Sequence, residues 1–92
     1  MDFFTTFLNA SIVTAGTLLR NRNGYTSFDY ELFSRIGKQV AQAHVDTLMV
    51  EWDKLIDANV SDETRRQFVN AQALELGDKI AAAYHDEMVW AS

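Results

Sequence analysis

Cysteine and proline are both absent from this 92-residue chain, and its four glycines are isolated from one another. Without cysteine there is no disulfide framework, no thiolate nucleophile and no cysteine-based zinc module. Without proline, and with few glycines, little interrupts a helical pattern. These absences favour a helical domain that is stabilised by packing alone, and we expect it in the cytoplasm.

Positive charge is missing from the start of the chain, where no lysine or arginine precedes Arg20. The apolar residues between Phe3 and Leu19 are interrupted by threonine, serine and asparagine. A secretion signal needs a basic start, and a membrane-spanning helix needs about 20 predominantly apolar residues. We therefore expect a soluble chain that carries neither.

The overall charge is acidic, with a formal net value of -5. Acidic chains are repelled by the phosphate backbones of nucleic acids and by anionic lipid headgroups. We therefore expect no direct binding of nucleic acid and no membrane binding. A protein with a basic surface is the more natural partner.

Hydrophobic residues make up 48% of the chain and aromatic residues 12%. This supply suffices for one hydrophobic core, so we expect a single helical domain over residues 1–92. A chain of this size hides only about 60–65% of the surface that it exposes when unfolded. Its stability is therefore limited without close packing or a partner subunit, and we expect self-association as a homodimer.

Apolar residues recur at intervals of three and four along three long segments, which is the period of an amphipathic α-helix. The segments cover about residues 2–20, 28–58 and 62–91, and the second has the clearest apolar stripe. The predicted fold is all-α, an antiparallel helical bundle of three long helices, or of four if the last segment breaks near Gly77. The second helix would span about 46 Å, which is long for so small a domain.

Residues with capping chemistry mark the helix ends. Asp2 is a candidate cap for the first helix, and Thr26 or Ser27 for the second. Between the second and third helices, Asn59 suits a left-handed stop and Ser61 suits a cap. A stop at residues 21–24 and a corner at residues 59–61 are therefore expected.

His44 is the strongest candidate for chemistry, because it lies in the apolar stripe of the second helix with Glu51 two turns further on. The pair suggests a metal ligand or a proton-transfer pair. Helices that bind metals usually place ligands three or four residues apart, and His44 has none at those positions. We expect a core or interface histidine with one polar partner, and we expect His85 to be solvated beside Asp86 and Glu87.

Other signatures of catalysis are missing from the sequence. There is no glycine-rich phosphate loop, no HExxH or ExxH pair and no nucleophile elbow. We therefore predict a protein that is not an enzyme, with no catalytic, cofactor-binding or metal-binding residues and no cofactor.

A weak helix-turn-helix pattern runs over residues 58–68, where Arg65 and Arg66 are candidates for reading DNA. Asp62 and Glu63 stand at the entry of that helix, where they would meet phosphates. An ordinary helical corner with exposed arginines is the preferred interpretation, and a DNA-binding regulator is the alternative.

Two sets of residues are candidates for partner binding. Asp46, Asp53 and Asp57 share one helical face and could occupy a basic groove, although such a row is more often a solvated surface. Trp52 and Trp90 are candidate anchors, because the aromatic residues are many for so small a core.

The sequence thus predicts a non-enzymatic protein-protein interaction protein. The most specific hypothesis is a small acidic inhibitor, of the type used by phages and mobile elements, that blocks a basic surface of a nucleic-acid-handling host protein. A structural homodimer or assembly subunit is the main alternative. A metal enzyme built on His44 and a DNA-binding regulator are the others.

Overall fold

The computed structural model describes the backbone of residues 3–91 and the side chains of residues 5–90. Over that range the chain forms three helices and no strand: α1 (Phe3–Asn23), α2 (Tyr30–Asp57) and α3 (Asp62–Ala91). The prediction of an all-α bundle of three long helices is confirmed. The cap expected at Asp2 lies outside the described residues.

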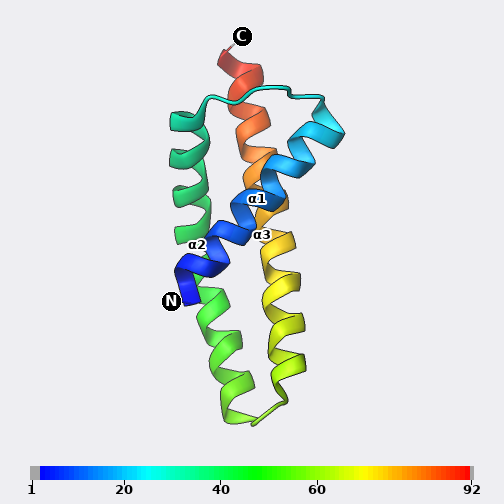
Figure 1. The fold of residues 1–92 in the computed structure, drawn as a ribbon. Helices are drawn as coiled ribbons and strands as arrows, with labels where there is room; N and C mark the ends of the chain where they lie inside the picture. The colour runs from blue at the N-terminus through cyan, green and yellow to red at the C-terminus, as the bar shows by residue number, and fades with distance from the viewer. Residues whose placement is uncertain (1–2, 92) are drawn as a thin grey trace.

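α2 and α3 form a long antiparallel hairpin, and α1 lies diagonally across one side of it (Figure 1). α1 packs mainly against α3 and touches α2 only lightly. The molecule is elongated, with extents of 49 × 22 × 21 Å. The hairpin therefore extends well beyond the part that α1 covers, and we call its far part, residues 49–72, the distal hairpin.

α3 runs through Gly77 without a break, so the three-helix alternative holds. Gly77 is buried where α1 crosses α3. A Cβ atom at this position would lie 2.6 Å from Thr14 Cγ2, 2.7 Å from Thr14 Cβ and 3.0 Å from the carbonyl oxygen of Ser11. Gly77 is therefore a contact residue that lets two helix backbones approach closely, and it ends no helix.

The end of α1 follows the predicted chemistry at a slightly later position. Gly24 has a φ of 72°, and the Tyr25 backbone N–H donates to the Leu19 carbonyl oxygen at 3.3 Å. Because a left-handed glycine ends the helix, α1 runs to Asn23, beyond the expected end at Arg20.

The predicted caps at Thr26 and Ser27 are wrong. Asp29 caps α2, and its carboxylate accepts the backbone N–H of Leu32 at 3.1 Å. The backbone N–H of Asp29 in turn donates to Tyr84 Oη at 3.0 Å. A tertiary contact to α3 thus fixes where α2 begins, which the local sequence does not show.

The corner between α2 and α3 agrees with the prediction. Asn59 has a φ of 52°, and Ser61 Oγ accepts the backbone N–H of Thr64 at 3.2 Å. A left-handed asparagine and a serine cap therefore reverse the chain within a few residues.

The core occupies only the part of the hairpin that α1 covers. Its buried apolar residues are Phe7, Ala15, Leu19, Phe33, Ile36, Ala41, Leu48, Ala73, Leu76, Ile80, Ala81 and Tyr84. No residue of the distal hairpin, from Met49 to Gln72, is buried. The distal hairpin is thus a two-helix structure with no closed core of its own.

Candidate partner-binding surfaces

Asp46, Asp53 and Asp57 lie exposed on one side of α2, as the sequence predicts. Among the described residues, none of the three carboxylates forms an ion pair. Five other carboxylates do, including Glu51 with Lys54 and Asp78 with Arg22, at 3.2 Å and 2.5 Å. The aspartate row therefore presents charge that the chain itself does not neutralise.

Apolar side chains alternate with the aspartates along the same face. Met49, Val50 and Ile56 are 40%, 54% and 45% exposed. With the aspartates they continue one helical spacing of three and four residues on the side of α2 opposite its buried stripe. We call this set the α2 stripe: Asp46, Met49, Val50, Asp53, Ile56 and Asp57.

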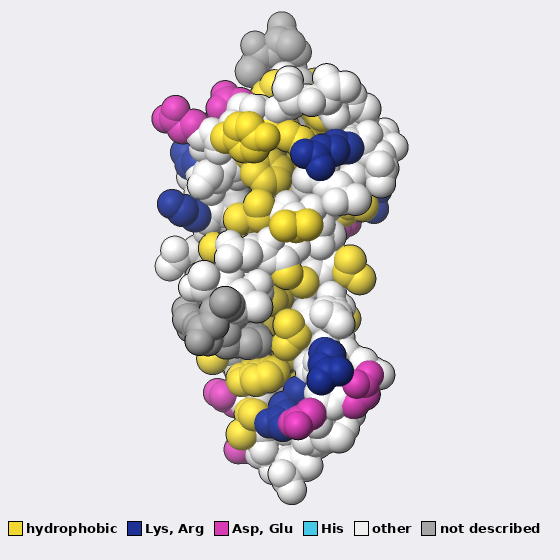
Figure 2. Space-filling model, in the orientation of Figure 1, with side chains coloured by type: hydrophobic (Ala, Val, Ile, Leu, Met, Phe, Trp, Pro, Cys, Tyr) yellow, Lys and Arg dark blue, Asp and Glu magenta, His cyan; other side chains and the backbone are white. Residues whose placement is uncertain are grey.

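The sequence prediction missed the apolar members of the α2 stripe. The spacing itself was the available signal, because apolar residues on the polar face of an amphipathic helix break its pattern. Figure 2 shows hydrophobic, acidic and basic side chains together at the end of the molecule where α2 turns into α3. A partner that covers the α2 stripe would thus meet charge and apolar area together.

The two predicted tryptophan anchors lie in different places. Trp52 is half-buried and packs on Phe68 of α3, with ring centroids 6.3 Å apart. Trp90 is 88% exposed near the C-terminal end of α3, at the opposite end of the molecule from Asp57 (Figure 1). The structure therefore brings Trp52 and the aspartates to the same half of α2 and separates Trp90 from them.

His44 is buried between α2 and α3 and uses both ring nitrogens. Nε2 lies 2.9 Å from Gln72 Oε1, and Nδ1 lies 3.3 Å from Lys79 Nζ. Because an ammonium group only donates, Nδ1 accepts from Lys79 and the Nε2–H donates to Gln72. The sequence predicted one polar partner, and the structure supplies two.

The structure does not bring His44 and Glu51 together as the pair that the sequence suggested. Glu51 pairs with Lys54 instead, and Lys79 also reaches Glu75 at 3.6 Å. In the part of the chain that the structure describes, no three side chains of the metal-binding types come together. His44 thus takes part in a polar link between two helices.

Replacing His44 with leucine is expected to preserve the helical fold and to change the free energy of unfolding by no more than about 1 kcal/mol. The reason is that Gln72 and Lys79 are not fully buried and can turn to water. Circular dichroism during urea unfolding measures the effect. Elemental analysis of the purified parent checks the metal alternative: stoichiometric metal that disappears in His44→Leu would contradict a packing role.

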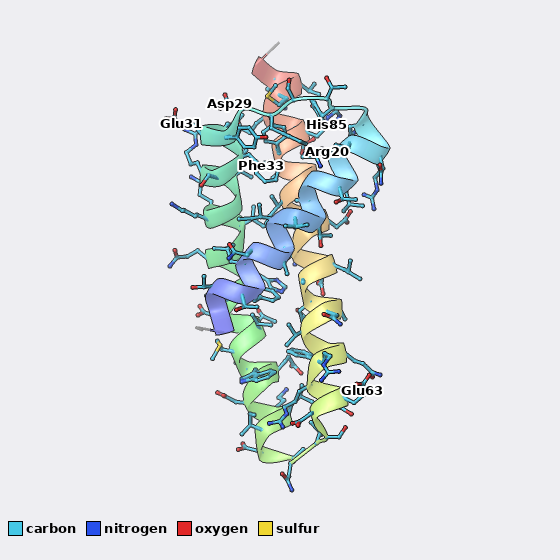
Figure 3. All side chains as sticks on the ribbon, viewed as in Figure 1. Arg20, Asp29, Glu31, Phe33, Glu63 and His85 are labelled. Carbon is cyan, nitrogen blue, oxygen red and sulfur yellow. The ribbon has the colours of Figure 1, made fainter. Side chains whose placement is uncertain are left out.

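His85 is half-buried and not simply solvated. Its Nδ1 lies 2.9 Å from Tyr25 Oη, and the two rings pack edge to face at 5.9 Å. Tyr25 also contacts Tyr84 and Phe28, so the loop between α1 and α2 is held to α3 by aromatic rings. Figure 3 labels His85 near this loop. This aromatic cluster closes the proximal end of the core.

The arginines of the suspected recognition helix are engaged within that helix. Arg65 pairs with Asp62, and Arg66 pairs with Glu63 at 3.4 Å. Each pair joins residues three apart in the first turns of α3. The two arginines therefore have local acidic partners that a phosphate would have to displace.

A shallow groove of about 210 Å³ lies between α1 and the start of α2. Its lining includes Ile12, Val13, Tyr30 and Phe33, and the Arg20 guanidinium stacks over Phe28 at 5.3 Å. Figure 3 shows Arg20 and Phe33 on this face. The groove is open and mostly apolar, and it is separate from the α2 stripe.

No described helix combines the length and the apolar character that crossing a membrane requires. Comparison with family models, with curated proteins and with solved structures gave no match.

Proposed function

We propose that this protein is a non-enzymatic binding protein whose α2 stripe docks on a basic surface of another protein. The observation that supports this most is the row of three exposed aspartates with no ion pair among the described residues. Unneutralised rows of one sign steer encounters with surfaces of the opposite sign. The interleaved Met49, Val50 and Ile56 add apolar area, which exposed charge alone does not provide.

The class of partner that suits this surface best is a nucleic-acid-handling protein, because such proteins present basic grooves to phosphate. An acidic row can occupy such a groove and block it. The proposed activity is therefore inhibition by occupancy, of the type used by phages and mobile elements against host proteins, in the cytoplasm.

Reversing the three aspartates to lysine should slow association with such a partner and leave the helices intact, because all three side chains are exposed. At about 0.15 M salt the screening length is about 8 Å, so the association rate of the parent should also fall as salt rises. Surface plasmon resonance with the captured partner at several salt concentrations measures both effects. If neither salt nor the triple substitution changed the association rate, the aspartate row would be only a solvated surface and would not bind the partner.

A homodimer or assembly subunit is the second candidate function. The chain exposes 6107 Å², whereas a compact monomer of its mass exposes about 5,400 Å². The excess arises in an elongated molecule whose distal hairpin has no buried residue. Both facts favour a partner that covers part of the exposed surface, and a second copy of this chain could be that partner.

Self-association remains a prediction with a direct test. Sedimentation across micromolar to hundred-micromolar concentrations should show a species of twice the monomer mass of 10.5 kDa. A monomer throughout that range would contradict the homodimer.

A further inference from the structure

We propose that the α2 stripe binds a basic amphipathic helix of its partner, an inference that rests on the proposed function and names the element the partner presents. The surface has the two chemistries that such a helix needs. Three aspartates that form no ion pair within the described part of the chain offer sites for lysine or arginine, and three exposed apolar residues offer contact area. The six side chains all belong to one helix, so their relative positions are fixed by its backbone.

The shape of the α2 stripe favours a helical ligand. From Asp46 to Asp57 the row advances about 16 Å along the axis, with its members three or four residues apart. Two helices pack by fitting such ridges into each other's grooves at axis separations of about 8–10 Å. A ligand with apolar and basic residues at the same period therefore meets the whole row, as amphipathic helices do in other recognition surfaces.

The place of the α2 stripe in the fold leaves it open to a ligand, because all six of its residues are exposed. α1 makes the proximal half of the molecule a three-helix bundle, whereas the distal hairpin has two helices and no buried residue. The α2 stripe lies almost wholly on the distal hairpin, with Asp46 just before it. Because the α2 stripe lies on the side of α2 opposite its buried stripe, a bound helix would pack along the outer side of α2 and would bury apolar area that is now exposed.

Charge disfavours a second copy of this chain as the occupant. The six residues of the α2 stripe include three aspartates and no lysine or arginine. Two such stripes in contact would oppose like charges, which destabilises a helix pair and discriminates against it. A basic helix instead places a positive charge opposite each of the three aspartates.

The probe for this inference is a fluorescein-labelled peptide of about 18 residues, or about five helical turns. It carries leucine and lysine at helical spacing, so that one face is apolar and its flanks are basic. A second peptide has the same composition in an order that forms no apolar face. Fluorescence anisotropy at about 0.15 M salt measures the affinity of the full chain for both. We expect the amphipathic peptide to bind at least about tenfold more tightly.

Two variants and one matched control locate the site. Asp46→Asn, Asp53→Asn and Asp57→Asn combined should weaken binding of the amphipathic peptide about tenfold. Met49→Ser, Val50→Ser and Ile56→Ser combined should weaken it by a similar factor through faster dissociation. The control removes three exposed acids elsewhere, as Glu31→Gln, Asp86→Asn and Glu87→Gln, and should keep the affinity within about twofold. Because all these side chains are exposed, the fold should persist in each variant.

The outcomes separate this inference from the proposed function. Equal affinity for the two peptides would overturn the helical ligand and leave an acidic docking row intact. The inference would also be overturned if the control variant weakened binding as much as the stripe variants do. Acidic residues anywhere on the surface would then be enough to bind the peptide. A dimer of the parent that the stripe variants dissolve would make a second copy the occupant and refute a basic helix. A different result would contradict the proposed function: an association rate with the captured partner that changes neither with salt nor with the lysine substitutions.

Discussion

Replacing Tyr84 with alanine is expected to lower the free energy of unfolding by about 3–5 kcal/mol. Tyr84 is 0% exposed. Its ring packs against Phe33, Tyr25 and Phe28 at centroid distances of 5.3, 5.7 and 6.0 Å. Truncation leaves a cavity where α2, α3 and the loop after α1 meet, and the rigid helices around it can close it only in part.

The conservative variant Tyr84→Phe separates the ring from the hydroxyl. It keeps the packing but removes the acceptor for the Asp29 backbone N–H, so a loss of about 1 kcal/mol is expected. Urea unfolding followed by circular dichroism gives both values. Similar losses for the two variants would contradict the assignment of the large effect to packing, and no loss for Tyr84→Ala would contradict its place in the core.

Gly77→Ala is expected to destabilise the protein by about 1–2 kcal/mol, although alanine is the better helix former. The added methyl group would meet Thr14 Cβ at 2.7 Å and the Ser11 carbonyl oxygen at 3.0 Å. Neither atom can rotate away, because Cβ and the carbonyl oxygen are fixed by the backbone of α1. The two helices must therefore separate, and the packing around their crossing loosens.

Gly16→Ala is the matched control for this prediction. Gly16 also lies within a helix, but a Cβ there meets nothing within 4 Å. Only the higher helix propensity of alanine should then matter, so the free energy of unfolding of this variant should rise by about 0.5–1 kcal/mol. Thermal unfolding of the two variants gives the comparison. A gain at Gly77 equal to that at Gly16 would contradict a close crossing of α1 and α3.

The sequence predicts the three helices well because each depends on a local signal that is repeated many times. The corner at Asn59 and Ser61 is predicted for the same reason, since its capping contacts span only a few residues. The start of α2 is not predicted, because the position of Asp29 depends on a hydrogen bond to Tyr84 in another helix. Gly77 stayed ambiguous for a similar reason, since its contact residues belong to α1.

The candidate surface is predicted only in part. Helical periodicity places Asp46, Asp53 and Asp57 on one face, and the structure shows this arrangement. Periodicity within one helix cannot show that Trp90 lies at the far end of the bundle from them, because that depends on how α3 folds back. It also cannot show that α1 leaves the distal hairpin uncovered, because that depends on the direction in which α1 crosses the other two helices.

The measurement that tests the central claim most directly is capture of partners by the tagged full chain, followed by quantitative mass spectrometry. The comparison uses the parent, the variant with Asp46, Asp53 and Asp57 changed to lysine, and a control with Glu31, Asp86 and Glu87 changed to lysine. We predict a basic protein that the parent and the control enrich and the aspartate variant does not. The same proteins captured equally by all three would contradict binding through the α2 stripe.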